Sequence, residues 1–84
     1  MIRYTVVWLK TALEDLAESW INSPDRSAVT AAVRRIDGQL GEDAFSKGIE
    51  LSEGLRTVVV HPLRVLFAVR DADRIVEVVR VRPA

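Results

Sequence analysis

Hydrophobic and polar residues alternate along the first segment of the chain, from Ile2 to Trp8. An alternation with a period of two predicts a β-strand, because successive side chains of a strand point to opposite faces. Tyr4, Val6 and Trp8 share one of these faces, and Arg3, Thr5 and Val7 share the other. Trp8 fits the pattern of a core residue.

The period then changes to that of a helix. Thr11 and Glu14 have the spacing of a capping box, in which each side chain bonds to the other residue's backbone amide at a helix start. An apolar stripe follows at intervals of three and four residues, and we expect it to face the core. Its members are Leu13, Leu16, Ala17, Trp20 and Ile21.

A second helix is predicted from Pro24 to about Leu40, with Ser23 as its cap. Gly41 is expected to end it in the left-handed conformation. The short break between the helices predicts an antiparallel hairpin. The apolar stripe of this helix consists of Val29, Val33, Ile36 and Leu40.

The remaining half of the chain reads as extended segments. Residues 41–48 predict a loop that Phe45 anchors to the core, and Ile49–Leu51 a short extended piece. Pro62 and Asp71-Ala72-Asp73 mark turns between longer strands. The short turns predict a meander. These strands are expected at Leu55–His61, Arg64–Arg70 and Arg74–Arg82.

This order predicts one α+β domain over residues 1–84, with the topology β-α-α-β-β-β. The helical hairpin should pack on one face of a mostly meandering antiparallel sheet and leave the other face open. The chain has no cysteine, which excludes disulfides and thiolate metal sites. It has no apolar run of about 18 residues and no signal peptide, so we expect a cytoplasmic protein without membrane contact. We expect no cofactor and no metal site, since Asp71 and Asp73 fit the backbone bonding of a hairpin turn.

Charge is distributed unevenly although the net charge is zero. Residues 1–55 carry a net charge of −3, and residues 56–84 carry +3. Every basic residue of the second part is an arginine, the side chain best suited to bidentate contacts with phosphate or carboxylate. Counting faces along the predicted strands yields an apolar strip framed by cations on the open face, which is typical of a partner site. We assign it Arg56, Val58, Val60, Arg64, Leu66, Val76, Val78, Arg80 and Arg82.

Several motifs resemble the RelE/ParE toxin superfamily, the toxins of plasmid stabilisation and type II toxin–antitoxin systems. The first half contains Tyr4-x-Val6-x-Trp8, Ala12-x-x-Asp15-Leu16 and Ala32-x-x-x-Ile36-x-x-x-Leu40. The second half contains Gly48, Ser52-x-Gly54-Leu55-Arg56, Pro62-Leu63-Arg64-Val65-Leu66-Phe67-x-Val69 and Asp73-Arg74-Ile75-Val76-x-Val78-x-x-Val81. This similarity covers nearly the whole chain and consists of apolar positions and turns.

The resemblance implies a bacterial toxin that a cognate antitoxin wraps and neutralises. It implies a target that is gyrase-like or ribosomal, bound through the arginine-framed sheet face. An acidic and apolar antitoxin segment would occupy that face or the helical hairpin. For the assembly, a dimer and a toxin–antitoxin hetero-oligomer are the alternatives.

The resemblance leaves two mechanisms open. Ribonucleases of the RelE type use sheet cations, and Arg56 and Arg64 stand where two of these would fall. With His61, they are the candidate catalytic residues of a metal-free, ribosome-dependent mRNA endonuclease. The downstream arginine and tyrosine of that branch have no counterpart here, and cleavage requires an acid and a base. The chain therefore fits the non-ribonuclease ParE-like branch better; a non-toxic interaction module is the third alternative.

Overall fold

A computed structural model, which describes residues 3–84, contains five strands and two α-helices in the predicted order. Ile2 of the predicted first strand lies outside the described residues. Two short 3₁₀ turns, Ala44–Ser46 and Asp71–Asp73, complete the connections. The elements are β1 (Thr5–Trp8), α1 (Lys10–Asn22), α2 (Arg26–Asp43), β2 (Ile49–Ser52), β3 (Leu55–Val60), β4 (Leu63–Arg70) and β5 (Ile75–Pro83).

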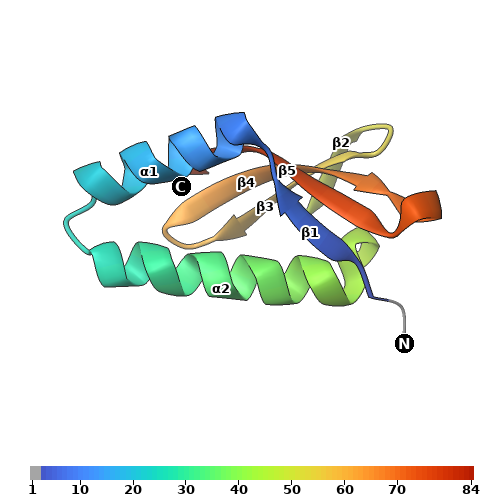
Figure 1. Ribbon diagram of the computed structural model, residues 1–84, viewed down its shortest axis with the longest axis horizontal. Coiled ribbons are helices and arrows are strands. Elements are labelled where there is room, and N and C mark those ends of the chain that lie inside the picture. The colour runs from blue at the N-terminus through green and yellow to red at the C-terminus, as the bar shows by residue number, and fades with distance from the viewer. Residues whose placement is uncertain (1–2) are drawn as a thin grey trace.

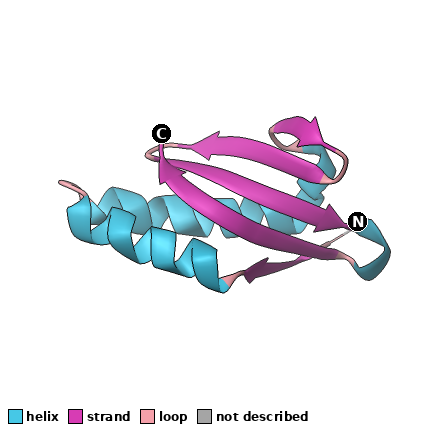
Figure 2. Ribbon diagram, turned by 90° about the horizontal axis from the view of Figure 1, so that it is seen from above, coloured by secondary structure: helices cyan, strands magenta, loops and turns pink. Residues whose placement is uncertain are grey.

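The five strands form one sheet in the order β1-β5-β4-β3-β2. The strands from β2 to β5 make the predicted antiparallel meander, whereas β1 pairs in parallel with β5. The first and last strands of the chain are therefore neighbours (Figure 1). Both helices lie on the same side of the sheet, which leaves the other side open (Figure 2).

The core lies between α2 and the sheet. Apolar side chains of α2 at helical spacing meet the alternate side chains of β4 and β5, and removing this surface from water stabilises the fold. Trp8 packs against the core as predicted, and its indole N–H donates to Asp37 at 2.7 Å. The fully buried members with the largest side chains are Phe67, Ile36, Leu40, Leu63, Val29, Val65, Val76, Val78 and Val81.

The predicted capping box at the start of α1 is wrong. The helix begins at Lys10, and its N-cap is Leu9, which makes no side-chain cap bond. Thr11 lies inside the helix, where its hydroxyl donates to the carbonyl of Val79, 2.9 Å away. A contact across 68 positions in the sequence therefore replaces the local bond that the motif suggested.

The predicted limits of α2 are also corrected. Asp25 is the N-cap, and its carboxylate accepts from the amide of Ala28; Ser23 instead accepts from the amide of Asp25. Gly41 does not end the helix, which continues to Asp43. Gly41 is buried, and its carbonyl accepts from the backbone amide of Tyr4 at 2.8 Å.

The loop after α2 differs from the prediction at Phe45. The side chain of Phe45 is exposed, and its ring meets the ring of Tyr4 edge-on with the centroids 6.4 Å apart. It therefore rests against the outside of the core. Within residues 3–84, neither helix combines the length and apolar content that a membrane span requires.

Candidate binding surfaces

The apolar stripe of α1 does not face the core, contrary to the prediction. Ala12 is the only residue of α1 that is buried. The side chains of Trp20 and Ile21 are 42% and 61% exposed, and Leu13 is also exposed. Leu16 alone of the stripe packs against the core. Most of this stripe is therefore a surface feature.

The stripe forms one wall of an apolar groove between the two helices. This interhelical groove has a volume of about 510 Å³. The outer side of α2 supplies its second wall, with Arg34 as its one charged lining residue. The groove is lined by Leu13, Leu16, Ala17, Trp20, Ile21, Val29, Thr30, Val33 and Arg34.

Arg26 holds the end of the groove in place. Its guanidinium lies 4.5 Å from the centre of the Trp20 ring, in a cation–π contact. The same side chain donates to the carbonyls of Trp20 and Ile21, each at 3.2 Å. These are carbonyls at the end of α1 that lack partners within the helix. Arg26 therefore joins the first turn of α2 to the last turn of α1 and fixes the Trp20 ring.

The open face of the sheet differs from the predicted strip because all four valines of that strip face the helices. Val60, Val76 and Val78 belong to the buried core, and Val58 packs against it. In β3 and in the first half of β5, the set of residues that was predicted for the open face is the one that faces the helices. These valines are removed from the candidate surface.

A β-bulge explains why the pattern of β5 misled the prediction. Phe67 pairs with Val78, but its neighbour Leu66 pairs with Arg80, so that Val79 is an extra residue on β5. A bulge of this kind reverses the alternation beyond it. Val78 and Val81 therefore both face the core, and Arg80 and Arg82 take the side of the open face.

Arg56 is a structural residue in this fold rather than an exposed cation. It shares the helix-facing side of β3, and its side chain is only 15% exposed. Its guanidinium donates to the carbonyls of Lys47 and Gly48, at 3.0 and 3.2 Å. These bonds hold the loop before β2 against β3, which removes Arg56 from the candidate catalytic and binding residues.

Arg64 and Arg82 are exposed on the open face and lie directly opposite each other on β4 and β5. Side chains of directly opposed residues are close neighbours, so these two like charges repel each other. Neither guanidinium has an ion pair or side-chain hydrogen bond within residues 3–84. Leu66 is the next residue on the same face of β4. We call Arg64 and Arg82 the arginine pair; it can bind a carboxylate or a phosphate.

Arg80 begins on the same face but turns its guanidinium over the sheet edge to α1. Its Nε and Nη2 donate to the two carboxylate oxygens of Asp15, at 2.8 and 3.2 Å. This bond to Arg80, with the Val81 amide as a smaller contributor, lowers the pKa of Asp15, although desolvation acts in the opposite direction. Asp15 is therefore ionised at neutral pH, and the charge of Arg80 is already matched.

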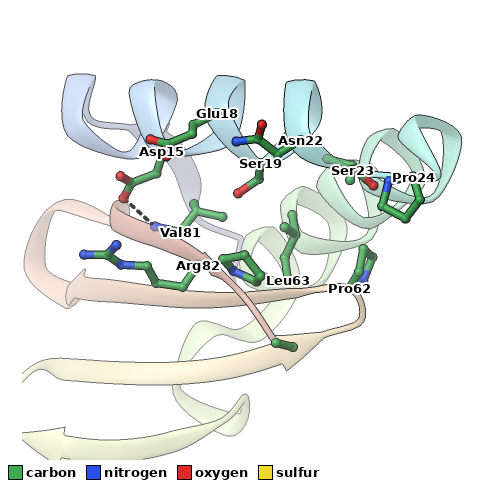
Figure 3. Close-up of a pocket in the computed structure, with 13 residues that line it drawn as sticks. Asp15, Glu18, Ser19, Asn22, Ser23, Pro24, Pro62, Leu63, Val81 and Arg82 are labelled. Carbon is green, nitrogen blue, oxygen red and sulfur yellow. Dashed lines mark hydrogen bonds between the residues drawn. The ribbon is translucent and has the colours of Figure 1, made fainter.

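A second cavity, of about 300 Å³, lies beside this contact, between α1 and the end of β5 (Figure 3). Glu18, Ser19 and Asn22 line its α1 side, and Leu63 and Val81 line its sheet side. Arg82 also lines it, and its side chain extends along the sheet. The cavity therefore adjoins the arginine pair.

His61 and the acidic turn behave as surface features. His61 is exposed at the turn between β3 and β4, and its carbonyl accepts from Arg35 at 3.0 Å. Asp71 accepts from the hydroxyl of Tyr4 at 2.7 Å and pairs with Arg74 at 2.8 Å. The bond to Asp71 is the main cause of the raised pKa of Tyr4. This cluster fastens the turn before β5 to the start of β1.

Sequence reasoning missed Asp15 and the groove as features of the surface. Asp15 is followed by Leu16 in the middle of an amphipathic helix, where a carboxylate is ordinarily solvated. The sequence contained one indication of the groove, because the α1 stripe ends in two adjacent large side chains, Trp20 and Ile21.

No protein-family model and no curated protein matches the chain. Its fold is similar to that of solved structures over almost its whole length. One is the RelBE2 toxin–antitoxin complex of Mycobacterium tuberculosis, with a TM-score of 0.82 and 23% identity over 99% of this chain and 100% of that one.

Two further structures show the same similarity. The chromosomal ParDE system of P. aeruginosa gives a TM-score of 0.68 and 19% identity, over 100% of this chain and 99% of that one. A free E. coli RelE toxin mutant gives 0.72 and 13%, over 98% and 84%. Both RelE and ParE structures thus match, which does not distinguish the two branches. The chain has the fold of the RelE/ParE toxin superfamily.

Proposed function

We propose that this protein is the toxin component of a type II toxin–antitoxin system that acts in the bacterial cytoplasm. The uncovered interhelical groove carries the proposal, because a chain of 84 residues has few large apolar side chains to leave in water. The similar structures include toxins solved with their antitoxins, RelBE2 of M. tuberculosis and RelBE of E. coli among them.

The groove is suited to an amphipathic segment of a cognate antitoxin. Its lining is apolar, and Trp20 and Ile21 offer large side chains that gain most from being covered. Arg34 lies at its edge, and its charge would pair with a carboxylate of the incoming segment. A helix whose apolar face enters the groove and whose acidic residues meet Arg34 satisfies both features.

The arginine pair is suited to the target. Two opposed guanidinium groups that form no ion pair within residues 3–84 are stabilised by an anion that bridges them, and arginine offers paired donors in a planar fork. The anion can be a carboxylate of a gyrase-like protein or a phosphate of a ribosomal complex. The aromatic side chains of residues 3–84 lie on the helix side of the sheet, in the groove or in the loop after α2. None of them is therefore on the open face, where a nucleotide base could stack on it. This favours a protein target, as in ParE-like binding.

The second candidate is a metal-free endoribonuclease. It is supported by the position of His61, which lies at the turn that leads directly into Arg64. In this reaction the 2′-hydroxyl would attack the phosphate and displace the 5′ oxygen, His61 would take the proton of the hydroxyl and return it to the departing oxygen, and the arginine pair would stabilise the charged phosphate. Primer extension on a message translated in vitro distinguishes the candidates, since codon-positioned cuts indicate the enzyme.

Growth of a bacterial host after induced expression tests the proposed function. We expect arrest with the wild type and growth with Arg64→Glu/Arg82→Glu, because reversing both charges repels the anion. Arg3→Gln/Lys10→Gln is the control, since both residues are exposed and lie outside the two candidate surfaces. Growth with soluble, folded wild type would contradict the proposal.

A further inference from the structure

The edge of β5 is completed in two different ways along its length. Its first part, Ile75–Val78, pairs in parallel with β1. Among residues 3–84, no strand pairs with that side of β5 beyond Val78, and a free strand edge exposes backbone groups that need partners. The backbone amide of Leu9 donates to the carbonyl of Val78, and beyond this point side chains of α1 bond to the edge of β5.

Two side chains one helical turn apart continue the hydrogen bonding. The Thr11 hydroxyl donates to the carbonyl of Val79 at 2.9 Å, and the Asp15 carboxylate accepts from the amide of Val81 at 3.0 Å. Residues at positions i and i+4 of a helix lie on the same face, so both reach the strand together. Figure 3 shows the hydrogen bond that the Val81 amide donates to Asp15, between β5 and α1.

Asp15 acts at the point where the alternation of β5 has just been reversed. The bulge at Val79 directs Val81 into the core and Arg82 onto the open face, opposite Arg64. Bulges locally disrupt the ladder, and the residues after them need other restraints. The Asp15 side chain is 14% exposed, and its carboxylate accepts hydrogen bonds from the Arg80 guanidinium and from the Val81 amide. The residue next to Val81 is Arg82.

We propose that Asp15 is the positioning residue of the arginine pair: its bond to the Val81 amide holds the strand after the bulge, and thereby holds Arg82 opposite Arg64. Asp15 does not touch the ligand. This inference rests on the part of the proposed function in which the arginine pair binds an anionic group. A site that depends on two opposed side chains loses affinity when one of them becomes mobile.

Titration of the protein with inorganic tripolyphosphate, followed by NMR, tests the inference. All variants carry Arg80→Gln, because a substitution of Asp15 would otherwise release the Arg80 guanidinium, which could itself bind the anion. In that background we expect Asp15→Ala to bind about tenfold more weakly than Asp15→Asn, which has the same charge, as a loosened site does. Asp15→Asn keeps one acceptor for the Val81 amide and should restore most of the affinity. Thr11→Val removes the neighbouring bond on the same edge and should change the affinity less than about twofold.

The outcomes separate the inference from the proposed function. Equal losses for Asp15→Ala and Thr11→Val would overturn the positioning role, because any loosening of α1 would then suffice. Equal affinities of Asp15→Ala and Asp15→Asn would also overturn it. If the starting protein binds no tripolyphosphate, or if Arg64→Gln/Arg82→Gln binds equally well, the arginine pair is not an anion site and the inference is overturned with it. Growth arrest measures the toxin function separately.

Hydrogen exchange of the unaltered protein provides a test that needs no variant. The Val81 amide lies on a strand edge without a strand partner, so it should exchange rapidly unless Asp15 holds it. We expect protection of Val81 comparable to that of amides paired with β1. Rapid exchange at Val81 would overturn the positioning role.

Discussion

The two helices carry similar apolar stripes, yet they use them differently. Along α2, the side chains of Val29, Ile36 and Leu40 are buried against the sheet. Along α1, Ala12 alone is buried, and the stripe that ends with Ile21 lies at the surface. The comparison teaches that helical spacing of apolar residues predicts a helix with a contact face, but not whether the contact is within the chain or with another molecule.

The difference follows from what each helix has beneath it. α2 lies over the sheet and contacts β1 and β3, whereas α1 runs along β5. The attachment of α1 to β5 combines polar bonds from Thr11 and Asp15 with the small buried side chain of Ala12 and needs little apolar area. The large side chains of α1 are thus available for the groove.

Truncating one isoleucine in each helix should produce the largest contrast. Ile36→Ala leaves a cavity in the core and should lower the free energy of unfolding by about 2–5 kcal/mol. Ile21→Ala removes an exposed side chain and should change it by less than about 0.5 kcal/mol. Urea denaturation followed by circular dichroism measures both. Similar losses for the two variants would contradict the distinction between the helices.

The binding role of the α1 stripe is tested by Trp20→Ala. We expect the affinity for the cognate antitoxin to fall at least about thirtyfold, because a large aromatic side chain in a groove is typical of a binding hot spot. Isothermal titration measures the change. Phe45→Ala is the matched control, since Phe45 is an equally exposed aromatic outside the groove. If both substitutions weaken binding alike, the groove is not the antitoxin site.

The polar attachment of α1 predicts a specific sensitivity to acid. The pKa of Asp15 in the folded protein lies below its ordinary value of 3.8, chiefly because of Arg80. The stabilisation is therefore complete above about pH 4 and is lost as the pH falls through the lower, folded-state value. We expect the free energy of unfolding of the wild type to fall more steeply in this window than that of Asp15→Asn. Parallel curves would mean that this carboxylate contributes no pH dependence.

The smallest effect is expected at the junction of the two helices. Arg26→Gln removes the cation–π contact and the bonds to the last carbonyls of α1, and should cost less than about 1 kcal/mol because the site is exposed. The indole signal of Trp20 in NMR spectra should nonetheless shift and broaden. Arg35→Gln, which loses a bond to the His61 carbonyl, should leave that signal unchanged.

Local patterns were sufficient to predict much of the fold. The order of elements, the α2 stripe and the meander of the last strands depend on neighbours close in sequence, and each was correct. The start of α1 was misread because the Thr11 hydroxyl bonds to Val79, far along the chain. A capping motif indicates which bond is available locally, whereas tertiary contacts decide which bond forms.

The candidate site was harder to predict, and the reason is the bulge at Val79. Its extra residue reverses the alternation within β5, so a single parity count assigns Val76 and Arg82 to the same face when they lie on opposite ones. The prediction for Arg56 was wrong for another reason: Arg56 donates to the carbonyls of Lys47 and Gly48, and these lie within reach only because the loop before β2 folds back. Neither fact is visible in residue type.

The parallel pairing of β1 with β5 has a consequence for the order of events during translation. Thr5 pairs with Ile75, which is synthesised about 70 residues later. At 5–20 residues per second, β1 waits about 4–14 s for its place in the sheet. The nascent chain therefore lacks both a closed sheet and the strand that bears Arg82 until β5 has been synthesised, so the arginine pair is complete only after the other strands of the sheet have been made.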